Sequence, residues 1–362
     1  MTSATSLVLP EGSVIGILGG GQLGRMTAIA AAELGYRCHV FAPEGDAPAT
    51  DIAMTSTRAA YEDEDALAAF ADSVDTITSE FENVPAETME FLGQRRPVSP
   101  GAEALRVAQH RIAEKSLAAK LGIATPRFAA IARADQIAEP LADMPNGAIL
   151  KTCRFGYDGK GQMPVMAAGE ADQAFDALRS DDCILEERID FIAEVSFLIA
   201  RTENGETALF PPSLNTHKAG ILDTSTAPAD RDIVSLALVR EGGEAALALA
   251  DHLALTGLLA VEMFVKDNRL IFNEMAPRPH NSFHWTIEGA ETSQFAQLVR
   301  AITGLPLGST KATGVWQMEN ILGQDMEKLD LAMGQPGAYI HRYGKAAARP
   351  GRKMAHITRQ LS

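Results

Sequence analysis

Two glutamates of the sequence, Glu262 and Glu274, are spaced so that they can bind one cation. They lie in the strand-like stretches LLAVEMFV and RLIFNEMAP, and a three-residue turn centred on Asn268 would place them directly opposite each other in a β-hairpin. Facing carboxylates repel each other unless a cation lies between them. Mg²⁺ that also binds nucleotide phosphates needs only one or two protein carboxylates, and Asn273 adds an amide oxygen. The alternative is a carboxylate pair on the solvent side of an antiparallel sheet.

The glycines of VIGILGGGQLGRM, residues 14–26, indicate a second binding element. Gly19, Gly21 and Gly24 have the spacing G-x-G-x-x-G between a strand-like run and an alanine-rich helix. Such a turn directs free N–H groups at the phosphate of either a dinucleotide or a mononucleotide. Glu44, after the next strand-like run, is the acidic residue available to a dinucleotide ribose. A tight strand-to-helix turn that binds nothing is the third interpretation.

A third candidate is the polar loop KTCRFGYDGKGQ at residues 151–162. Its glycines Gly156, Gly159 and Gly161 alternate with groups that bind phosphate, amine or sugar, among them Lys160. This pattern is typical of a lid over nucleotide phosphates, although it lacks the spacing of a Walker loop. The alternative is the solvated tip of a hairpin.

Acidic residues also follow the strand-like run CILEERI. Glu186 and Glu187 lie at its end, and Glu194 follows shortly after. Backbone groups at a strand exit suit an adenine edge, and a nearby carboxylate suits a ribose. The alternative is that these carboxylates are simply solvated.

Composition limits the class of protein. The 362 residues suggest two or three lobes, and 46% hydrophobic with 22% charged residues is typical of a soluble globular protein. A net charge of −15 disfavours binding to nucleic acid or to an anionic membrane. Cys38, Cys153 and Cys183 form no C-x-x-C pair, which indicates reduced thiols. With no run of 18 apolar residues, the sequence predicts a cytoplasmic protein that binds neither membrane nor nucleic acid.

The order of the expected elements indicates how these motifs are positioned. From residue 14, apolar strands alternate with alanine-rich helices, which predicts a parallel α/β sheet that ends at the proline-rich segment 95–101. Residues 102–122 favour one helix. Between about 127 and 190 three strand-like runs predict a small unit, and the following runs predict an antiparallel α+β unit. The stretch after about 305 holds short strands and the basic segment HRYGKAAARPGRKMAHIT.

Seven motifs in order carry a resemblance to a known family. They are GGGQLGRM, EFENVP, AQHRIAEK, FGYDGKGQ, EVS, NEMAPRPHNSFHWT and RPGRKMAHI. Together they resemble the 5-(carboxyamino)imidazole ribonucleotide synthase (PurK) family of the ATP-grasp superfamily, over roughly residues 12–358. The resemblance implies an ATP-grasp fold with a Rossmann-like, pre-ATP-grasp parallel-sheet domain at 1–99. It further implies an ATP-grasp domain at 100–304 with a lid at about 123–190, and a small β-rich C-terminal domain at 305–362.

The activity that this resemblance implies is an ATP-dependent carbon–nitrogen ligation. ATP and Mg²⁺ would convert bicarbonate to carboxyphosphate, because bicarbonate is a poor electrophile until one oxygen becomes a leaving group. The carboxyl group would then pass to the exocyclic amine of 5-aminoimidazole ribonucleotide, with release of ADP and phosphate. The family resemblance also suggests a homodimer.

The resemblance implies the roles of the site residues, position by position. Contacts to ATP are expected from Arg111, Lys151, Gly156, Tyr157, Asp158, Gly159, Lys160, Gly161, Gln162, Glu186, Glu187, Arg188, Ile189, Glu194, His217, Asn273 and Glu274. Contacts to the aminoimidazole ribonucleotide are expected from Gln22, Leu23, Glu82, Tyr157, Asp158, Lys160, Lys345, Arg352 and Lys353. Glu262 and Glu274 would hold Mg²⁺, and Arg278, His280 and Asn281 would hold bicarbonate or carboxyphosphate as the catalytic group. The anion at the opening glycine loop becomes the phosphate of the ribonucleotide.

Four residues depart from the pattern of that family. The family usually has Asp at the position of His110, Arg at that of Cys153, and Gly at those of Phe283 and Ala355. Because bulky Phe283 adjoins the expected bicarbonate region, His284 is left out of the predicted site.

Two other functions fit parts of the pattern. Another ATP-grasp ligase or formyltransferase of purine biosynthesis would share the ATP site and differ in its acceptor. A catalytically silent nucleotide-binding protein would lack a metal or phosphate ligand, whereas Glu262, Glu274, Lys151 and Lys160 are all present.

Overall fold

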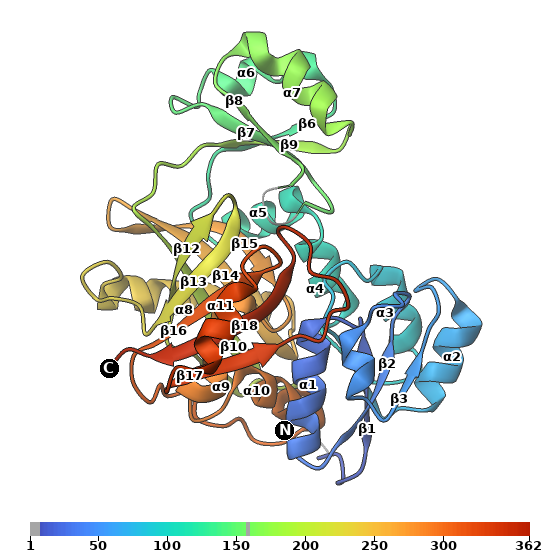
Figure 1. Cartoon of the computed structure of the whole chain (residues 1–362). Helices are drawn as coiled ribbons and strands as arrows, with labels where there is room; N and C mark the ends of the chain where they lie inside the picture. The colour runs from blue at the N-terminus through green and yellow to red at the C-terminus, as the bar shows by residue number, and fades with distance from the viewer. Residues whose placement is uncertain (1–7, 157–159) are drawn as a thin grey trace, which may run out of the picture.

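The structure, a computed structural model, describes residues 8–156 and 160–362 and contains three β-sheets (Figure 1). A five-stranded parallel sheet lies at the N-terminal end, a four-stranded antiparallel sheet stands apart from it, and a large antiparallel sheet lies between them. This architecture confirms the predicted combination of an α/β and an α+β unit. Within the described residues, no helix has the length and apolar character that crossing a membrane requires.

The N-terminal sheet has the strand order β3-β2-β1-β4-β5, all parallel. Its strands are β1 (Val14–Leu18), β2 (Arg37–Phe41), β3 (Thr55–Thr57), β4 (Thr76–Ser79) and β5 (Val98–Ser99), and its helices are α1 (Gln22–Glu33), η1 (Pro48–Asp51), α2 (Glu64–Asp72) and α3 (Ala86–Gly93). The turn between β1 and α1 depends on Gly19, whose φ of +102° is accessible to glycine and strained for other residues. The carboxyl ends of β1 and β4 therefore place the glycine loop beside the residues that follow Ser79.

Residues 102–122 form two helices where one was predicted. α4 (Ala102–Ala108) ends and α5 (Arg111–Lys120) begins on either side of Gln109 and His110. The Gln109 amide donates hydrogen bonds to the backbone carbonyls of Glu82 and Val84, and His110 has extended backbone angles. These tertiary contacts stop α4 although the local composition favours helix, and they aim the first turn of α5 at the interior of the molecule.

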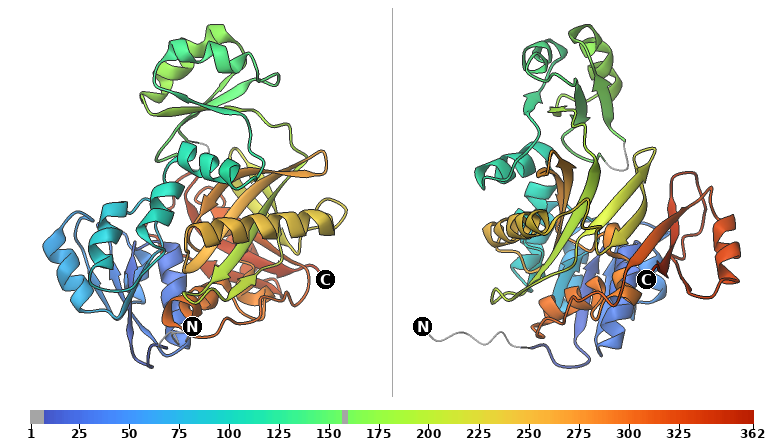
Figure 2. Two further views of the ribbon diagram at one scale, coloured as in Figure 1. Left: turned by 180° about the vertical axis from the view of Figure 1, so that it is seen from behind. Right: turned by 90° about the vertical axis from the view of Figure 1, so that its left-hand side faces the viewer.

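The small sheet has the strand order β6-β9-β7-β8. It consists of β6 (Phe128–Ile131), β7 (Ala148–Thr152), β8 (Gln162–Val165) and β9 (Cys183–Glu187), with the helices η2 (Ala134–Gln136), α6 (Ala138–Leu141), η3 (Ala168–Glu170) and α7 (Ala171–Leu178). The views of Figure 2 show α6 and α7 on one face of it. Strand β8 was not predicted. It contains Pro164, which removes a backbone donor and is tolerated because β8 is an edge strand.

The large sheet has the order β15-β14-β10-β12-β13-β16-β18-β17, with β11 paired to β10. Its strands are β10 (Ala193–Arg201), β11 (Thr207–Leu209), β12 (Ser213–Lys218), β13 (Ile221–Ala227), β14 (Gly257–Lys266), β15 (Arg269–Ala276), β16 (Trp316–Leu322), β17 (Ala338–Arg342) and β18 (Lys353–Gln360), and the remaining helices are α8 (Leu236–His252), η4 (Asn281–Phe283), α9 (Thr286–Gly289), α10 (Gln294–Thr303) and α11 (Glu327–Met333). The strands after residue 305, predicted as a small β-rich unit, thus extend this sheet rather than form a sheet of their own.

Two hydrophobic cores fix the large sheet in place. Helix α8 crosses one face (Figure 2), where Leu238 and Leu249 pack with residues of β10 and β14. In the other core, Leu298 and Phe295 of α10 cluster with Met26 of α1 and with residues of β10 and β14. The N-terminal domain and the large sheet therefore share one core, and the groups at their junction are held in a fixed arrangement.

Candidate functional site

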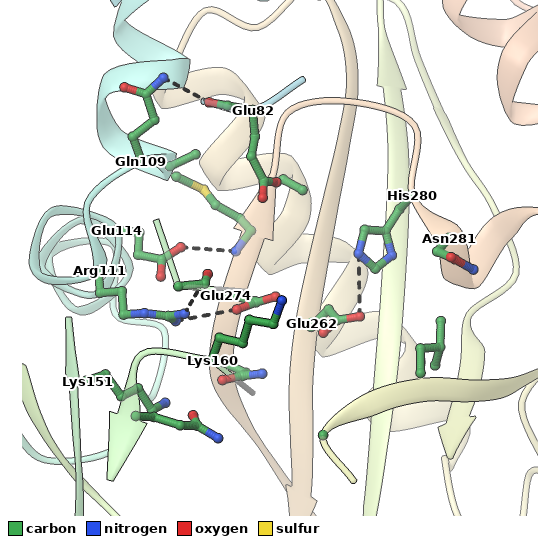
Figure 3. Close-up of a pocket in the computed structure, with 18 of the residues that line it drawn as sticks. Glu82, Gln109, Arg111, Glu114, Lys151, Lys160, Glu262, Glu274, His280 and Asn281 are labelled. Atoms are coloured by element: carbon green, nitrogen blue, oxygen red, sulfur yellow. Dashed lines mark hydrogen bonds and ion pairs between the residues drawn. The ribbon is translucent and has the colours of Figure 1, made fainter. Parts of the chain in front are cut away.

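A pocket of about 410 Å³ opens where β7, α5, β14 and β15 meet (Figure 3). The structure brings most of the predicted site residues to its wall. Those lining it are Glu82, Arg111, Lys151, Gly156, Lys160, Gln162, Glu194, His217, Glu262, Asn273, Glu274, Arg278, His280, Asn281 and Lys353. They come from all three sheets and their connections, so the pocket exists only in the folded chain.

Glu262 pairs with Glu274 as predicted, but the turn and the strand register that bring them together differ from the prediction. The turn between β14 and β15 has two residues, Asp267 and Asn268, with φ values of +50° and +54°, so Lys266 pairs with Arg269. That register alone would offset the two glutamates by one residue. A β-bulge between Glu262 and Met263 restores them as direct partners. The three-residue turn was wrong, and the pairing it predicted is right.

Three carboxylates converge at this point of the pocket. Glu262 is only 7% exposed, and burial together with Glu194 and Glu274 raises its pKa well above the usual range. Burial and the charge of Glu274 also raise the pKa of Glu194 to about 7. Ser196 donates one hydrogen bond to Glu262, at 3.2 Å. The raised pKa values mean that the ionised carboxylates are under-compensated in the protein alone, which is the condition a bound cation relieves. An oxygen-only donor set of this kind fits Mg²⁺.

Cationic side chains lie beside these carboxylates. Lys151 of β7 lies 2.6 Å from Glu186 of β9 and belongs to the small sheet, and the fully buried Lys115 of α5 lies 3.4 Å from the same carboxylate. Arg111, the first residue of α5, lies 3.5 Å from Glu274 and donates a hydrogen bond to the Gly156 carbonyl at 3.2 Å. These groups connect the small sheet, α5 and the carboxylate cluster in one charged network.

The glycine-rich loop contributes Gly156, Lys160 and Gln162 to the pocket wall. Gly161 follows with a φ of +69°, which supports the prediction that glycine is needed there for conformation. The predicted residues Tyr157, Asp158 and Gly159 lie outside the described residues.

Past the carboxylates, the pocket is lined by the residues of NEMAPRPHNS. The Arg278 guanidinium pairs with Glu82, with Nε at 2.9 Å from the carboxylate, and so links the end of β15 to the segment after β4. The His280 ring lies 3.7 Å from Glu262, and burial followed by the charge of Arg278 lowers the pKa of His280 well below its usual range. His280 is therefore a neutral imidazole. The Asn281 amide donates a hydrogen bond to Asn320 at 2.9 Å, which fixes its orientation.

The N-terminus of α1 holds a carboxylate where we expected a phosphate. Glu80, directly after β4, accepts hydrogen bonds from the backbone N–H groups of Gly21 at 2.7 Å and Gly24 at 3.3 Å. Burial raises the pKa of Glu80, while these two donors oppose the change. The glycine spacing therefore makes room for a side chain of this same protein, and two of the N–H groups assigned to phosphate are already occupied. Gln22 and Leu23 are the first two residues of α1.

The basic C-terminal segment contacts the N-terminal domain. Arg352 pairs with Asp46 at 2.9 Å, and Lys345 donates a hydrogen bond to the Lys353 carbonyl at 2.8 Å. Burial and the charge of Arg352 lower the pKa of Lys345 to about 8, while Glu80 opposes that shift. Lys353 lines the pocket itself, whereas Lys345 and Arg352 lie beside it.

The predicted adenine edge lies at the end of β9. Glu186 is buried and paired to lysines, while Glu187 lies 3.9 Å from Arg127 and Arg188 donates its N–H to the Gly147 carbonyl at 3.0 Å. Ile189 follows β9. Glu186 and Glu187 are the last residues of β9, and Arg188 and Ile189 begin the connection to the large sheet; none of the four is in the pocket lining.

Comparisons with known proteins agree with this geometry. The model of the ribonucleotide synthetase preATP-grasp domain family matches residues 13–109, that of the ATP-grasp domain 116–295, and that of the phosphoribosylaminoimidazole carboxylase C-terminal domain 317–360. The N5-carboxyaminoimidazole ribonucleotide synthase of Brucella melitensis is 42% identical over 354 residues, which cover 97% of each chain. The chain belongs to this synthase family.

Solved structures of the synthase family have the same fold. The ADP complex of an N5-carboxyaminoimidazole ribonucleotide synthetase superposes with a TM-score of 0.93 at 38% identity, covering 98% of this chain and 93% of that one. The Aspergillus clavatus synthase in complex with ADP and 5-aminoimidazole ribonucleotide gives 0.90 at 28% identity, covering 97% and 94%. The bifunctional purine synthesis protein of Dictyostelium discoideum is 40% identical over 379 residues, but the chain spans only 38% of its length.

Three pocket-region residues of this synthase family member escaped the sequence interpretation. Glu80 binds the glycine loop, Glu114 accepts a hydrogen bond from the Met275 N–H at 3.1 Å, and Lys115 donates one to the Asn273 carbonyl at 2.6 Å. Through these bonds, Glu114 and Lys115 of α5 fix the backbone of β15. The sequence held one indication: α5 has few apolar residues, and its buried side includes two charged residues beside Leu117 and Ala118.

Proposed function

We propose that the protein catalyses the ATP-dependent carboxylation of 5-aminoimidazole ribonucleotide by bicarbonate to 5-carboxyaminoimidazole ribonucleotide, with release of ADP and phosphate, in de novo purine biosynthesis. The observation that carries the proposal is the convergence in one pocket of the carboxylates of β14 and β15, the lysines of the small sheet and the Arg278–Glu82 pair. Membership of the synthase family over the whole chain supports the choice of substrates.

ATP binds between the small and large sheets in this proposal. The segment Glu186–Ile189 takes the adenine edge, and Glu194 and His217, 3.4 Å apart, take the ribose. Lys151, Arg111 and the loop from Gly156 to Gln162 surround the phosphates, where charge-assisted hydrogen bonds are strong.

Glu262 and Glu274 hold Mg²⁺, with Asn273 beside them. The ion, when bound, neutralises phosphate charge and orients the transferred phosphoryl group. The support is the electrostatic need already described: the charge of Glu274 contributes to the raised pKa values of buried Glu262 and of its neighbour Glu194, and a divalent cation there would favour the ionised form of both.

Bicarbonate and the carboxyphosphate made from it bind at Arg278, His280 and Asn281. Glu82 and the Pro279 carbonyl accept hydrogen bonds from the Arg278 guanidinium and hold it in position, so that it would stabilise developing negative charge without reorganising. Neutral His280 adds a hydrogen-bonding group but no further positive charge. A pocket closed by the small sheet excludes water, which the short-lived carboxyphosphate requires.

The ribonucleotide lies toward the N-terminal domain, with its phosphate at Lys345, Arg352 and Lys353 and its body near Gln22 and Leu23. With Glu80 occupying the N–H groups of the glycine loop, the basic C-terminal segment supplies the charge for the phosphate.

The discriminating experiment is a measurement of ADP formation with each acceptor. We expect ADP release that requires both bicarbonate and 5-aminoimidazole ribonucleotide. Activity with formate in place of bicarbonate would overturn the assignment in favour of a formyltransferase. We also propose that the protein is a cytoplasmic homodimer, and light scattering of the purified chain tests the oligomeric state.

A further inference from the structure

A cluster of three side chains lies at the junction of the small sheet with the rest of the molecule. His110 precedes α5, Cys153 follows β7, and Asp182 precedes β9 (Figure 1). One imidazole nitrogen, the thiol sulfur and one carboxylate oxygen all lie within 4.8 Å of one another. It is the one such group of His, Cys and acidic side chains found among residues 8–156 and 160–362.

We propose that His110, Cys153 and Asp182 form a binding site for a transition-metal ion of the zinc class, and that the bound ion ties the small sheet to the body of the protein and slows turnover. Imidazole, thiolate and carboxylate are the three ligand types that Zn²⁺ takes in proteins. Three ligands leave a fourth position for water, which suits a reversible site better than a closed structural one.

The backbone already holds the three residues together. The Cys153 N–H donates to the Asp182 carbonyl at 2.9 Å, and the Arg111 N–H, next to His110, donates to the Cys153 carbonyl at 3.0 Å. The His110 imidazole Nε2 lies 3.4 Å from the Asp182 carboxylate. Ligand atoms around a tetrahedral zinc ion lie about 3.3–3.8 Å apart, so binding requires the cluster to contract by only about 1 Å.

Access is also suitable. Cys153 is buried, whereas the Asp182 side chain is 49% exposed, so an ion can enter from solvent and reach the thiol. Each ion that binds releases one proton to solvent, because the S–H bond is replaced by a metal–sulfur bond.

The consequence follows from the neighbours of the cluster. Arg111 and Lys151, on either side of it, belong to the pocket in which ATP binds under the proposed function. An ion that joins His110 of the body to Cys153 and Asp182 of the small sheet restricts relative movement of the two. Nucleotide entry and product release require such movement in enzymes whose lobes close over substrate.

Binding is tested with Co²⁺ on the full chain, without any need for the proposed reaction. We expect the wild type to develop the near-ultraviolet thiolate-to-cobalt charge-transfer band at one ion per chain. Cys153→Ser and His110→Gln should each weaken Co²⁺ binding by at least about tenfold. Loss of a residue that only orients a metal ligand already lowers metal affinity by about that factor, and loss of the ligand itself should cost at least as much. Cys38→Ala, which removes a buried thiol of the N-terminal sheet, should leave the band unchanged. No band in the wild type, or equal bands in wild type and folded Cys153→Ser, overturns the site.

Regulation is tested by Zn²⁺ inhibition of ADP formation at saturating Mg²⁺, with each variant compared to its own zinc-free rate. We expect inhibition of the wild type that a chelator reverses, and at least about tenfold more Zn²⁺ should be needed to inhibit Cys153→Ser. That result supports slower turnover caused by an ion that joins the small sheet to the rest of the protein. Equal inhibition of wild type and Cys153→Ser overturns the regulatory role and points to Zn²⁺ at the carboxylates of β14 and β15.

Discussion

Glu262→Gln should make the metal-free protein more stable and the enzyme much less active. Burial and two neighbouring carboxylates raise the pKa of Glu262, so at neutral pH its carboxyl group is destabilised relative to the unfolded chain. Each pKa unit corresponds to about 1.4 kcal/mol, so the variant should gain on the order of 1 kcal/mol or more in free energy of unfolding. The Gln amide oxygen still accepts the Ser196 hydrogen bond.

Turnover should change in the opposite direction. Under the proposed function, Glu262 is one of two carboxylates that would hold Mg²⁺, so its removal should lower kcat by at least about a hundredfold, because charge that would fix the phosphate-bound ion is lost. Glu274→Gln, which removes the second carboxylate proposed to hold Mg²⁺, should show the same loss of turnover. Urea unfolding in chelator at pH 7.5 measures the first effect and steady-state ADP release measures the second.

A control at a half-buried, ion-paired glutamate separates these effects from those of losing any glutamate charge. Glu319, on β16, pairs with Lys328 at 2.7 Å and Arg359 at 3.3 Å and lies outside the pocket lining. Glu319→Gln should destabilise by about 0–1 kcal/mol and leave turnover unchanged. If Glu262→Gln instead destabilised the metal-free chain and kept near-normal turnover at saturating Mg²⁺, the metal role of Glu262 would be wrong.

Three further predictions test other parts of the molecule. Burial raises the pKa of Glu114 from 4.5 to about 8, so the free energy of unfolding of the wild type should fall by up to about 1 kcal/mol per pH unit as pH rises across that range. Urea unfolding between pH 5 and 8 should show a smaller dependence on pH for Glu114→Gln, and an unchanged dependence would contradict this prediction. Arg278→Lys cannot keep the forked contact with Glu82 and should lower kcat/KM by at least about tenfold with little change in melting temperature, and a near-normal value would remove Arg278 from the reaction. Gly242→Ala places a Cβ into the ring of buried Phe197 and should destabilise by about 1–3 kcal/mol despite the better helix propensity of Ala, measured by thermal unfolding; a rise in stability would show that the ring moves freely.

Local patterns were sufficient where neighbours in sequence decide the outcome. The alternation of strands and helices predicted β1, α1, β2 and β4, because buried parallel strands are short apolar runs. The facing of Glu262 and Glu274 was also predicted, although two errors of register cancelled: the turn is one residue shorter, and the bulge adds that residue back. Hydrophobic alternation is visible in the sequence, but the bulge is not. The predicted pairing of the two glutamates is therefore correct partly by chance.

Local patterns failed where a distant segment decides. The break between α4 and α5 depends on Gln109 reaching carbonyls more than 20 residues earlier, so no helix propensity could reveal it. Edge strand β8 forms because β7 offers it a partner, despite Pro164.

The opening glycine loop shows the same limit at the level of function. The glycine spacing predicts N–H groups that bind an anion, and in the structure the N–H groups of Gly21 and Gly24 bind the Glu80 carboxyl group, while that of Gly19 bonds to the Phe41 carbonyl. Which anion satisfies them depends on the residue that parallel pairing of β1 with β4 brings alongside, and that residue is Glu80. The glycine spacing therefore specifies a kind of contact, while the order of strands in the sheet specifies its partner. Under the proposed function, the charge for the ribonucleotide phosphate comes instead from the basic C-terminal segment, which no pattern within the first domain could indicate.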